Sequence, residues 1–271
     1  MNTFVYMDLI ETIEKYKHLG IDDVIDHEKF NLISIVYHST RIEGSTLTEV
    51  ETQVLLTEGL TPKGKPIEHS LMVTDHYAAL QFILKEAKAR RPVSTAFIQE
   101  INSLVVRNTG SFYNTIFGTV DARTGAFRKG NVTAGSTYFP NYDKVERLTD
   151  SMTDKINEKM QSDISVADQI NLAFDAHFNL VSIHPFYDDN GRTSRLLMNY
   201  IQACYQLPLA IVHNESKADY IQALIDTREK DDINIFRQFM NDEYKKCLAD
   251  EIKKFEDISK PKKGSGFHLM F

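Results

Sequence analysis

The sequence predicts a mainly α-helical fold that carries one small β element. Glycine and proline, the residues that most often interrupt helices, number 12 and 7 among 271 residues. Apolar residues recur at helical spacing over most of the chain. The exception lies between Asn108 and Tyr142, where five glycines stand among β-branched and aromatic residues. That mixture is typical of short strands joined by turns, as in a hairpin or flap.

The first part of the chain is predicted to be helical and to begin with a helical N-terminal extension over residues 1–26. Apolar periodicity and end signals predict four further helices, over Phe30–Ile42, Thr46–Leu56, Ile67–Ala89 and Ser94–Val106. Gly44 follows the first of these and suits the left-handed residue that often ends a helix. Thr46 and Glu49 form a predicted capping box at the start of the second.

After the β-prone region, helices resume at Val145 and continue with breaks to about Phe255, before a loose C-terminal tail. Apolar residues from Ile170 to Val181 lie on one helical face, and Asp168 is the predicted N-cap of that helix. A second periodic run, from Leu196 to Cys204, predicts another helix. A polar segment therefore joins two helices and leads directly into the start of the second.

Composition limits the classes of function. The formal charge of −7 and the isoelectric point near 5.7 argue against a nucleic-acid-binding surface, which is usually basic, although a local basic pocket is compatible with both values. Cys204 and Cys247 provide neither a disulfide framework nor a metal-binding pair. Residues 1–17 mix charges throughout, so no signal peptide is expected, and no apolar run reaches the roughly 18 residues of a transmembrane span. We therefore expect a cytoplasmic protein without nucleic-acid or membrane partners.

The segment His184–Arg195, HPFYDDNGRTSR, collects chemically capable groups between the two helices. His184 is a candidate general base, because an ordinary histidine titrates near neutrality. Asp188 is a candidate ligand for Mg²⁺, which would bring phosphate oxygens with it. Phe186 is expected to anchor the loop in the core.

The second half of this segment suits phosphate binding. Asn190 and Gly191 tolerate left-handed backbone geometry, so successive amides can form an anion-binding nest at a helix N-terminus. Arg192 and Arg195 stand three residues apart and can both reach a polyphosphate. Each residue by itself has a common structural explanation: a buried histidine, an Asp-Asn-Gly turn, solvated arginines. Their coincidence in one short segment favours a site that binds a nucleotide polyphosphate and activates an attacking hydroxyl.

This segment resembles the signature of the Fic family, HxFx(D/E)GN(G/K)RxxR. Seven of its eight specified positions match, namely His184, Phe186, Asp188, Asn190, Gly191, Arg192 and Arg195, and Pro185 stands at a position that the signature leaves open.

Two other segments extend the resemblance. Gly125-Ala126-Phe127-Arg128 and residues 132–140 resemble the β-hairpin flap of the family, whose target-docking residues would here be Val132, Thr133, Ala134 and Gly135. Residues 39–44 fit (S/T)xxxE(G/N), the inhibitory helix of the family in its N-terminal placement, with Ser39, Glu43 and Gly44 as the matching residues. The expected domains are an N-terminal helical region with the inhibitory helix over 1–90, a Fic domain over 91–240, and a C-terminal helix and tail over 241–271.

The resemblance implies a nucleotidyltransferase that moves AMP from ATP to a Ser, Thr or Tyr hydroxyl of a target protein. His184 would deprotonate the hydroxyl that attacks the α-phosphorus. Asp188 would hold Mg²⁺ between the α- and β-phosphates. Asn190 would contact the α-phosphate, and backbone amides around Gly191 would cradle the phosphates.

The same resemblance implies control of the site in cis. Arg192 and Arg195 would bind the β- and γ-phosphates, and Glu43 would pair with Arg195 and keep it from the γ-phosphate. The flap would add the target peptide as an extra strand. Some family members with this arrangement form homodimers, which is the expectation here as well.

Asp189 departs from the family, which has Gly or Ala at this place in the predicted nucleotide-binding loop. Aspartate can adopt left-handed geometry, but it adds a β-carbon and a negative charge beside a polyanion. Its side chain could point to solvent or help to hold the metal. The departure leaves open a weakly active or non-catalytic nucleotide-binding module.

Other activities also stay open. The predicted loop contacts the phosphates and not the nucleobase, so a uridylyl or phosphocholine donor fits it as well. Glu43 could instead position water for removal of AMP from a modified target. A phosphotransferase of this fold would carry Lys where this chain has Gly191. A zinc hydrolase is disfavoured because His184 and Asp188 provide two ligands and no nearby histidine completes the set. The sequence does not identify the target protein.

Overall fold

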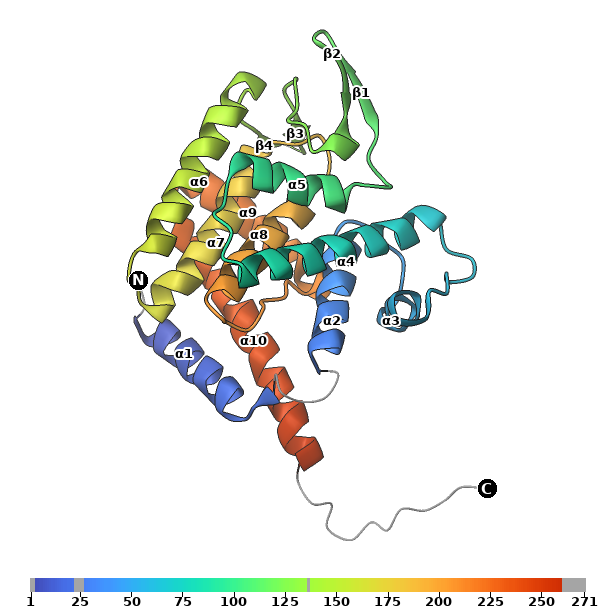
Figure 1. The fold of residues 1–271 in the computed structure, drawn as a ribbon. Helices are drawn as coiled ribbons and strands as arrows, with labels where there is room; N and C mark the ends of the chain where they lie inside the picture. The colour runs from blue at the N-terminus through green and yellow to red at the C-terminus, as the bar shows by residue number, and fades with distance from the viewer. Residues whose placement is uncertain (1–2, 22–26, 136, 260–271) are drawn as a thin grey trace.

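The computed structural model describes residues 3–21, 27–135 and 137–259, and Figure 1 shows its fold. The α-helices of these residues are α1 Thr3–His18, α2 His27–Ile42, α3 Glu49–Glu58, α4 Ile67–Lys88, α5 Thr95–Val105, α6 Val145–Gln161, α7 Val166–Ile183, α8 Asn190–Cys204, α9 Lys217–Lys230 and α10 Ile233–Ser259. The predicted mainly α-helical fold is confirmed, and α1 forms the described part of the N-terminal extension. The tail predicted after Lys260 lies outside the described residues.

The β structure divides into two hairpins, where the sequence suggested a single element. Strands β1 (Phe112–Thr115) and β2 (Gly118–Asp121) pair antiparallel, with Tyr113 opposite Val120. Strands β3 (Thr133–Ala134) and β4 (Thr137–Tyr138) form a second, shorter pair within the predicted flap. Both hairpins lie at the same end of the helical body (Figure 1).

The core is built around α7 and α8, the two helices that flank the polar segment. Phe174 and Leu180 of α7 and Leu197 and Ile201 of α8 are completely buried. Helices α4 and α5 pack on α8, α6 and α10 pack on α7, and α2 crosses α4 and reaches the start of α8 (Figure 1). The loop between α7 and α8 therefore joins two helices that are packed in the core. Among the described residues, no helix combines the length and the apolar composition needed to cross a bilayer.

Helix α3 begins two residues later than its sequence signal suggested. Its N-cap is Thr48, whose side chain accepts from the Glu51 amide at 3.2 Å while the Glu51 carboxylate accepts from the Thr48 amide at 2.8 Å. The predicted pair of Thr46 and Glu49 was wrong because Thr46 is engaged elsewhere. Its hydroxyl lies 3.0 Å from Nδ1 of His69 on α4.

Helix α7 also begins earlier than predicted, and Ser165 is its N-cap instead of Asp168. The Ser165 hydroxyl accepts from the Asp168 amide at 3.1 Å and donates to the Asp168 carboxylate at 2.7 Å. Asp168 thus lies inside the first turn, where its negative charge favours the helix N-terminus. The prediction was wrong because the apolar stripe, from which the start was read, begins one turn after the backbone becomes helical.

Replacing the observed cap tests this assignment. Ser165→Ala removes both hydrogen bonds at the start of α7, and we expect a loss of about 1 kcal/mol in the free energy of unfolding. Urea unfolding followed by circular dichroism measures the loss. Asp163→Ala, an exposed substitution two residues earlier, is the control and should change stability by less than about 0.5 kcal/mol. Equal effects of the two substitutions would contradict the assignment of Ser165.

Candidate functional site

His184 ends α7 in a left-handed conformation, with φ of 53°. This geometry turns the chain out of the helix and places the imidazole at the wall of a cavity. The ring stacks on Phe139, which follows the β3–β4 hairpin, with the ring centroids 3.9 Å apart and 14° between the planes. Its Nδ1 lies 3.3 Å from the Val181 carbonyl oxygen. Because a carbonyl can only accept, this contact places the proton on Nδ1 and leaves the lone pair on Nε2.

The surroundings of His184 keep it neutral. Burial lowers the pKa of His184 to about 4, and the positive charges of Arg128 and Arg228 act in the same direction. The ring is therefore unprotonated at pH 7 and able to accept a proton. This is the state that the predicted general base requires.

Arg128 connects the flap to the loop between α7 and α8, a contact that the sequence did not reveal. Its side chain is 2% exposed and donates from Nε to the His184 carbonyl oxygen at 2.8 Å and from Nη1 to that of Gly130, also at 2.8 Å. Its amide donates to the Pro185 carbonyl oxygen, and its Nη2 to that of Pro140. Arg128 thus holds both ends of the flap, at Gly130 and Pro140, and links them to the backbone of His184.

The turn between the helices is held by Phe186 and Asn190. Phe186 is 2% exposed, which confirms that it anchors the loop in the core. The Asn190 side chain accepts from the Phe186 amide and donates to the Phe186 carbonyl oxygen, each at 2.9 Å. These bonds give Asn190 a loop-closing role, and its contact with a phosphate stays a prediction.

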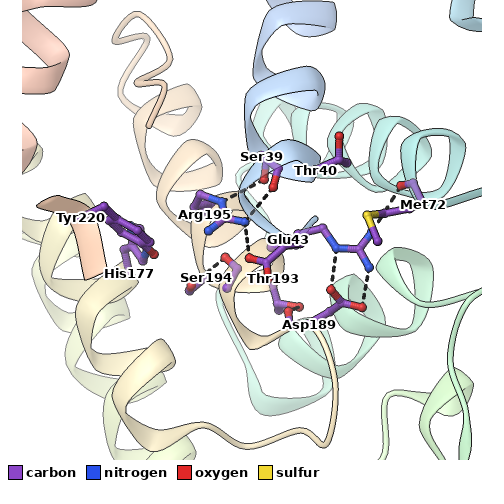
Figure 2. Close-up of polar contacts among 12 residues, drawn as sticks. Ser39, Thr40, Glu43, Met72, His177, Asp189, Thr193, Ser194, Arg195 and Tyr220 are labelled. Carbon is purple, nitrogen blue, oxygen red and sulfur yellow. Dashed lines mark hydrogen bonds and ion pairs between the residues drawn. The ribbon is translucent and has the colours of Figure 1, made fainter. Parts of the chain in front are cut away.

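Arg195 is buried at the start of α8 and faces α2 (Figure 2). Its Nε donates to the Ser39 hydroxyl at 2.9 Å, and its Nη2 donates to the Ser39 carbonyl oxygen at 3.1 Å and to Oε1 of Glu43 at 2.7 Å. Its Nη1 is buried and has no hydrogen-bond partner among the described residues. The predicted inhibitory residues Ser39 and Glu43 therefore both bind the guanidinium group of Arg195, whose Nη1 makes no hydrogen bond to a described residue.

Gly191 leaves room for the Glu43 carboxylate. A Cβ atom on Gly191 would lie 2.5 Å from Oε1 of Glu43 and 3.2 Å from Nη1 of Arg195. The carboxylate thus lies against the N-terminus of α8, where the helix dipole and exposed amides favour a negative charge. Gly44, with φ of 103°, ends α2 directly after Glu43. An anion already lies at the place where the sequence predicted that an anion binds.

Arg192 has different partners from Arg195, so the two arginines do not present one shared face to a polyphosphate. Its Nε donates to Oδ1 of Asp189 at 2.6 Å, its Nη2 pairs with the other oxygen of that carboxylate, and its Nη1 donates to the Met72 carbonyl oxygen at 3.3 Å. Asp189 adopts a left-handed conformation with φ of 60°. Its side chain is directed to the Arg192 guanidinium group, three residues further along the chain, rather than to solvent. A contact between Asp189 and a metal stays a prediction.

Asp188 is held by two residues that sequence reasoning missed. Its Oδ2 accepts from the Tyr113 hydroxyl at 2.6 Å, and its backbone carbonyl oxygen accepts from Nδ2 of Asn102 at 3.2 Å. Burial, together with this bond to Asp188, raises the pKa of Tyr113, so the phenol stays a hydrogen-bond donor. No spacing pattern connects Tyr113 or Asn102 with the loop, since they come from β1 and α5. In the described part of the chain, no three His, Cys, Asp or Glu side chains gather to hold a metal ion.

A cavity of about 310 Å³ adjoins these groups. Glu43, His184, Gly191 and Arg195 line one side of it, Lys217 and Arg228 of α9 add two cationic side chains, and much of the remaining wall is apolar. Ala134 is the predicted flap residue that lines this wall. Val132 is half-buried, and Thr133 and Gly135 are exposed. Asp188, Asp189, Asn190 and Arg192 do not line the cavity.

Comparisons with known proteins agree with this arrangement. Residues 92–202 match the model of the Fic/DOC family. The chain is 29% identical over 214 residues to the protein adenylyltransferase Fic of Drosophila willistoni, covering 79% of this chain and 40% of that protein. It is 27% identical over 256 residues to the protein of the same name from Drosophila virilis, covering 89% of this chain and 50% of that protein. The chain thus spans half the length, or less, of these curated relatives.

Two solved structures share the fold. A Fic-domain-containing signaling protein from Bacteroides thetaiotaomicron has a TM-score of 0.79 at 23% identity, over 92% of this chain and 98% of that one. Fic-1 from C. elegans has a TM-score of 0.74 at 24% identity, over 94% of this chain and 74% of that one. The predicted resemblance to the Fic family is confirmed, with residues 92–202 as the part that matches the family model.

The ion pair between Glu43 and Arg195 predicts a dependence of stability on acid pH. Burial raises the pKa of Glu43, but the charge and hydrogen bond of Arg195 outweigh it and hold the pKa below its usual value. A carboxyl group with a lowered pKa stabilises the fold above its unfolded pKa, and this contribution is lost as the pH falls through the folded pKa. Between pH 6 and pH 3 the free energy of unfolding should therefore fall less steeply in Glu43→Gln than in the native chain. Urea titrations measure both slopes. Glu58→Gln, at an exposed glutamate that ends α3, is the control and should show the same pH slope as the native chain. If Glu43→Gln also showed the slope of the native chain, the prediction would be wrong.

The neutral state of His184 predicts a low titration midpoint. NMR titration of the imidazole protons, assigned by comparison with His184→Gln, should place its pKa at about 4. Arg228→Gln should raise that value, because the Arg228 charge lowers it. A midpoint near 6.5 in the native chain would show that burial does not govern this histidine.

Proposed function

We propose that this chain, built on a Fic/DOC domain, transfers AMP from ATP with Mg²⁺ to a Ser, Thr or Tyr hydroxyl of a target protein and is inhibited in cis by Glu43. One observation carries the proposal. The Glu43 carboxylate lies in the anion cradle of Gly191, on the Arg195 guanidinium group and at the wall of the cavity that His184 lines. A site built to hold phosphate is thus filled by the chain's own negative charge.

His184 supplies the base of the proposed reaction. Its Nε2 takes the proton of the target hydroxyl while that oxygen forms a bond to the α-phosphorus. The bond between the α-phosphorus and the oxygen bridging to the β-phosphate breaks, and pyrophosphate leaves. The low pKa of His184 suits the first step, because the ring is neutral at pH 7.

Arg195 and the N-terminus of α8 are the groups proposed to hold the phosphates. The unpartnered Nη1 of Arg195 can donate to a phosphate oxygen, and the amides around Gly191 can do the same. Asp188 fits a magnesium site completed by the nucleotide, because Mg²⁺ in proteins is often held by one or two carboxylates together with substrate phosphates. The ion would neutralise phosphate charge during transfer. Asn190 keeps its predicted contact with the α-phosphate as part of this proposal.

Glu43 inhibits by competition in this proposal. A γ-phosphate needs the donors of Arg195 that the Glu43 carboxylate now occupies, and two negative groups repel each other in so small a space. Ser39 contributes by fixing Arg195 toward α2. ATP can then bind productively when the end of α2 moves away, or when Glu43 is absent.

The flap is proposed to dock the target. Thr133 and Ala134 form a two-residue strand with exposed side chains, paired on one side with β4. An extended peptide could add to the other edge through backbone hydrogen bonds. Because Arg128 anchors the flap to the carbonyl oxygen of His184, a peptide on that edge would be placed relative to the base.

The pair of Asp189 and Arg192 favours a second candidate, a nucleotide-binding module with weak transfer activity. Arg192 can bind the β-phosphate only by giving up the Asp189 carboxylate, which lies one turn away on the same element and cannot move far. Asp189→Gly would free Arg192 and distinguishes the two candidates, since it should raise activity if the pair is the limiting feature.

Labelled ATP tests the proposed transfer. With Mg²⁺, the Glu43→Gly variant should incorporate label from α-labelled but not γ-labelled ATP into protein and release pyrophosphate. Incorporation should exceed that of the native chain by at least about tenfold, which corresponds to removal of a coupling of about 1.4 kcal/mol. Glu43→Gly/His184→Ala should lose it.

Glu58→Gly is the matched control, because it removes an exposed glutamate at another helix end. It should leave incorporation at the native level. Incorporation of the γ label would indicate phosphoryl transfer. No incorporation from any variant, including Glu43→Gly/Asp189→Gly, would contradict AMP transfer and favour the binding module.

A further inference from the structure

We propose that Tyr113 is a positioning residue for the Asp188 carboxylate and sets how well Asp188 can hold a divalent cation. The inference rests on the proposed function, in which Asp188 holds Mg²⁺ together with nucleotide phosphates. It assigns a role in the site to the β1–β2 hairpin, which lies outside the helix–loop–helix element that carries the Fic signature (Figure 1).

Two contacts join Tyr113 to successive residues of the loop. Its hydroxyl donates to Oδ2 of Asp188 at 2.6 Å. Its ring stacks on that of Tyr187, with centroids 4.3 Å apart and 14° between the planes. The stacked rings fix the position of the phenol, so the hydroxyl is presented to the carboxylate at low entropic cost.

The backbone of Asp188 is held by a residue of a different element. Nδ2 of Asn102, a 1% exposed residue of α5, donates to the Asp188 carbonyl oxygen at 3.2 Å and lies 3.1 Å from the Thr193 hydroxyl of α8. The main chain is therefore fixed by Asn102, and the remaining freedom of the residue is rotation of its side chain. Tyr113 is the residue that restrains this rotation.

The type of donor matters as much as its position. Arg192 pairs a positive charge with Asp189, whereas Tyr113 donates a hydrogen bond to Asp188 without bringing a positive charge beside it. Tyr113 engages Oδ2 and leaves Oδ1 for a cation. Mg²⁺ requires near-ideal octahedral geometry, so a carboxylate held in one orientation binds it better than one that rotates.

Nucleotide binding measures this role without catalysis. In the Glu43→Gly background, the dissociation constant of α,β-methylene-ATP, which cannot be cleaved between the α- and β-phosphates, is determined by calorimetry with Mg²⁺ and with EDTA. The ratio of the two constants is the gain in affinity due to the metal. Tyr113→Phe keeps the stacked ring and removes the hydroxyl, and it should reduce this gain by about tenfold or more. Its constant in EDTA should stay within about twofold of the parent.

Tyr142→Phe is the matched control, because it removes the hydroxyl of a tyrosine whose ring packs on Phe117, in the turn between β1 and β2, and not on Tyr187. It should keep the full gain. Asp188→Asn should lose the gain and defines the lower limit.

Three outcomes overturn the inference. A full gain in Tyr113→Phe with none in Asp188→Asn would show that Asp188 needs no positioning, while the proposed function stands. Equal weakening with Mg²⁺ and with EDTA would show that Tyr113 supports the fold of the loop alone. No gain in the Glu43→Gly parent would remove the metal role of Asp188 and this inference with it, and the labelled-ATP assay then decides separately whether AMP is transferred.

Discussion

The buried guanidinium group of Arg195 is the constraint on which the site depends. A positive charge in the interior is costly unless it is paired and hydrogen-bonded, and here the partners come from another helix, namely Ser39 and Glu43 of α2. The pairing holds the end of α2 against the start of α8. It also fills the cradle over Gly191. The interaction that holds α2 against α8 therefore also occupies the proposed phosphate site.

The two arginines of α8 illustrate how the origin of a carboxylate changes its effect. Both guanidinium groups are almost completely buried, and each is paired with one acidic side chain. The partner of Arg195 belongs to a separate helix, so movement of α2 can release it. The partner of Arg192 is Asp189, three residues away, so this pair does not involve α2. The proposed regulation therefore concerns Arg195 and not Arg192.

The helical periods and the anchoring of the loop by Phe186, which were predicted from residues close together in the chain, agree with the structure. The pair of Glu43 and Arg195 spans 152 residues and was expected from the family resemblance alone, and the structure contains it. The observed starts of α3 and α7 differ from the predicted ones, because a threonine or an aspartate near the end of a helix can cap that helix or bind another group. Thr46 binds His69 of α4, and Asp168 is used by Ser165.

By itself, the sequence determined the fold class and the loop that carries the predicted base, because these depend on periodicity and on spacing within one segment. The resemblance of residues 39–44 to a known motif added the expected pair of Glu43 and Arg195. The tertiary structure alone decided the partners of Asp188, Asp189 and Arg192. The sequence left the direction of the Asp189 side chain open, and the structure pairs it with Arg192. No sequence pattern indicated Tyr113 or Asn102, because they contact Asp188 from β1 and α5. Contacts across such separations depend on how the elements pack. The low pKa of His184 likewise follows from burial and from Arg128 and Arg228, which packing brings to the ring.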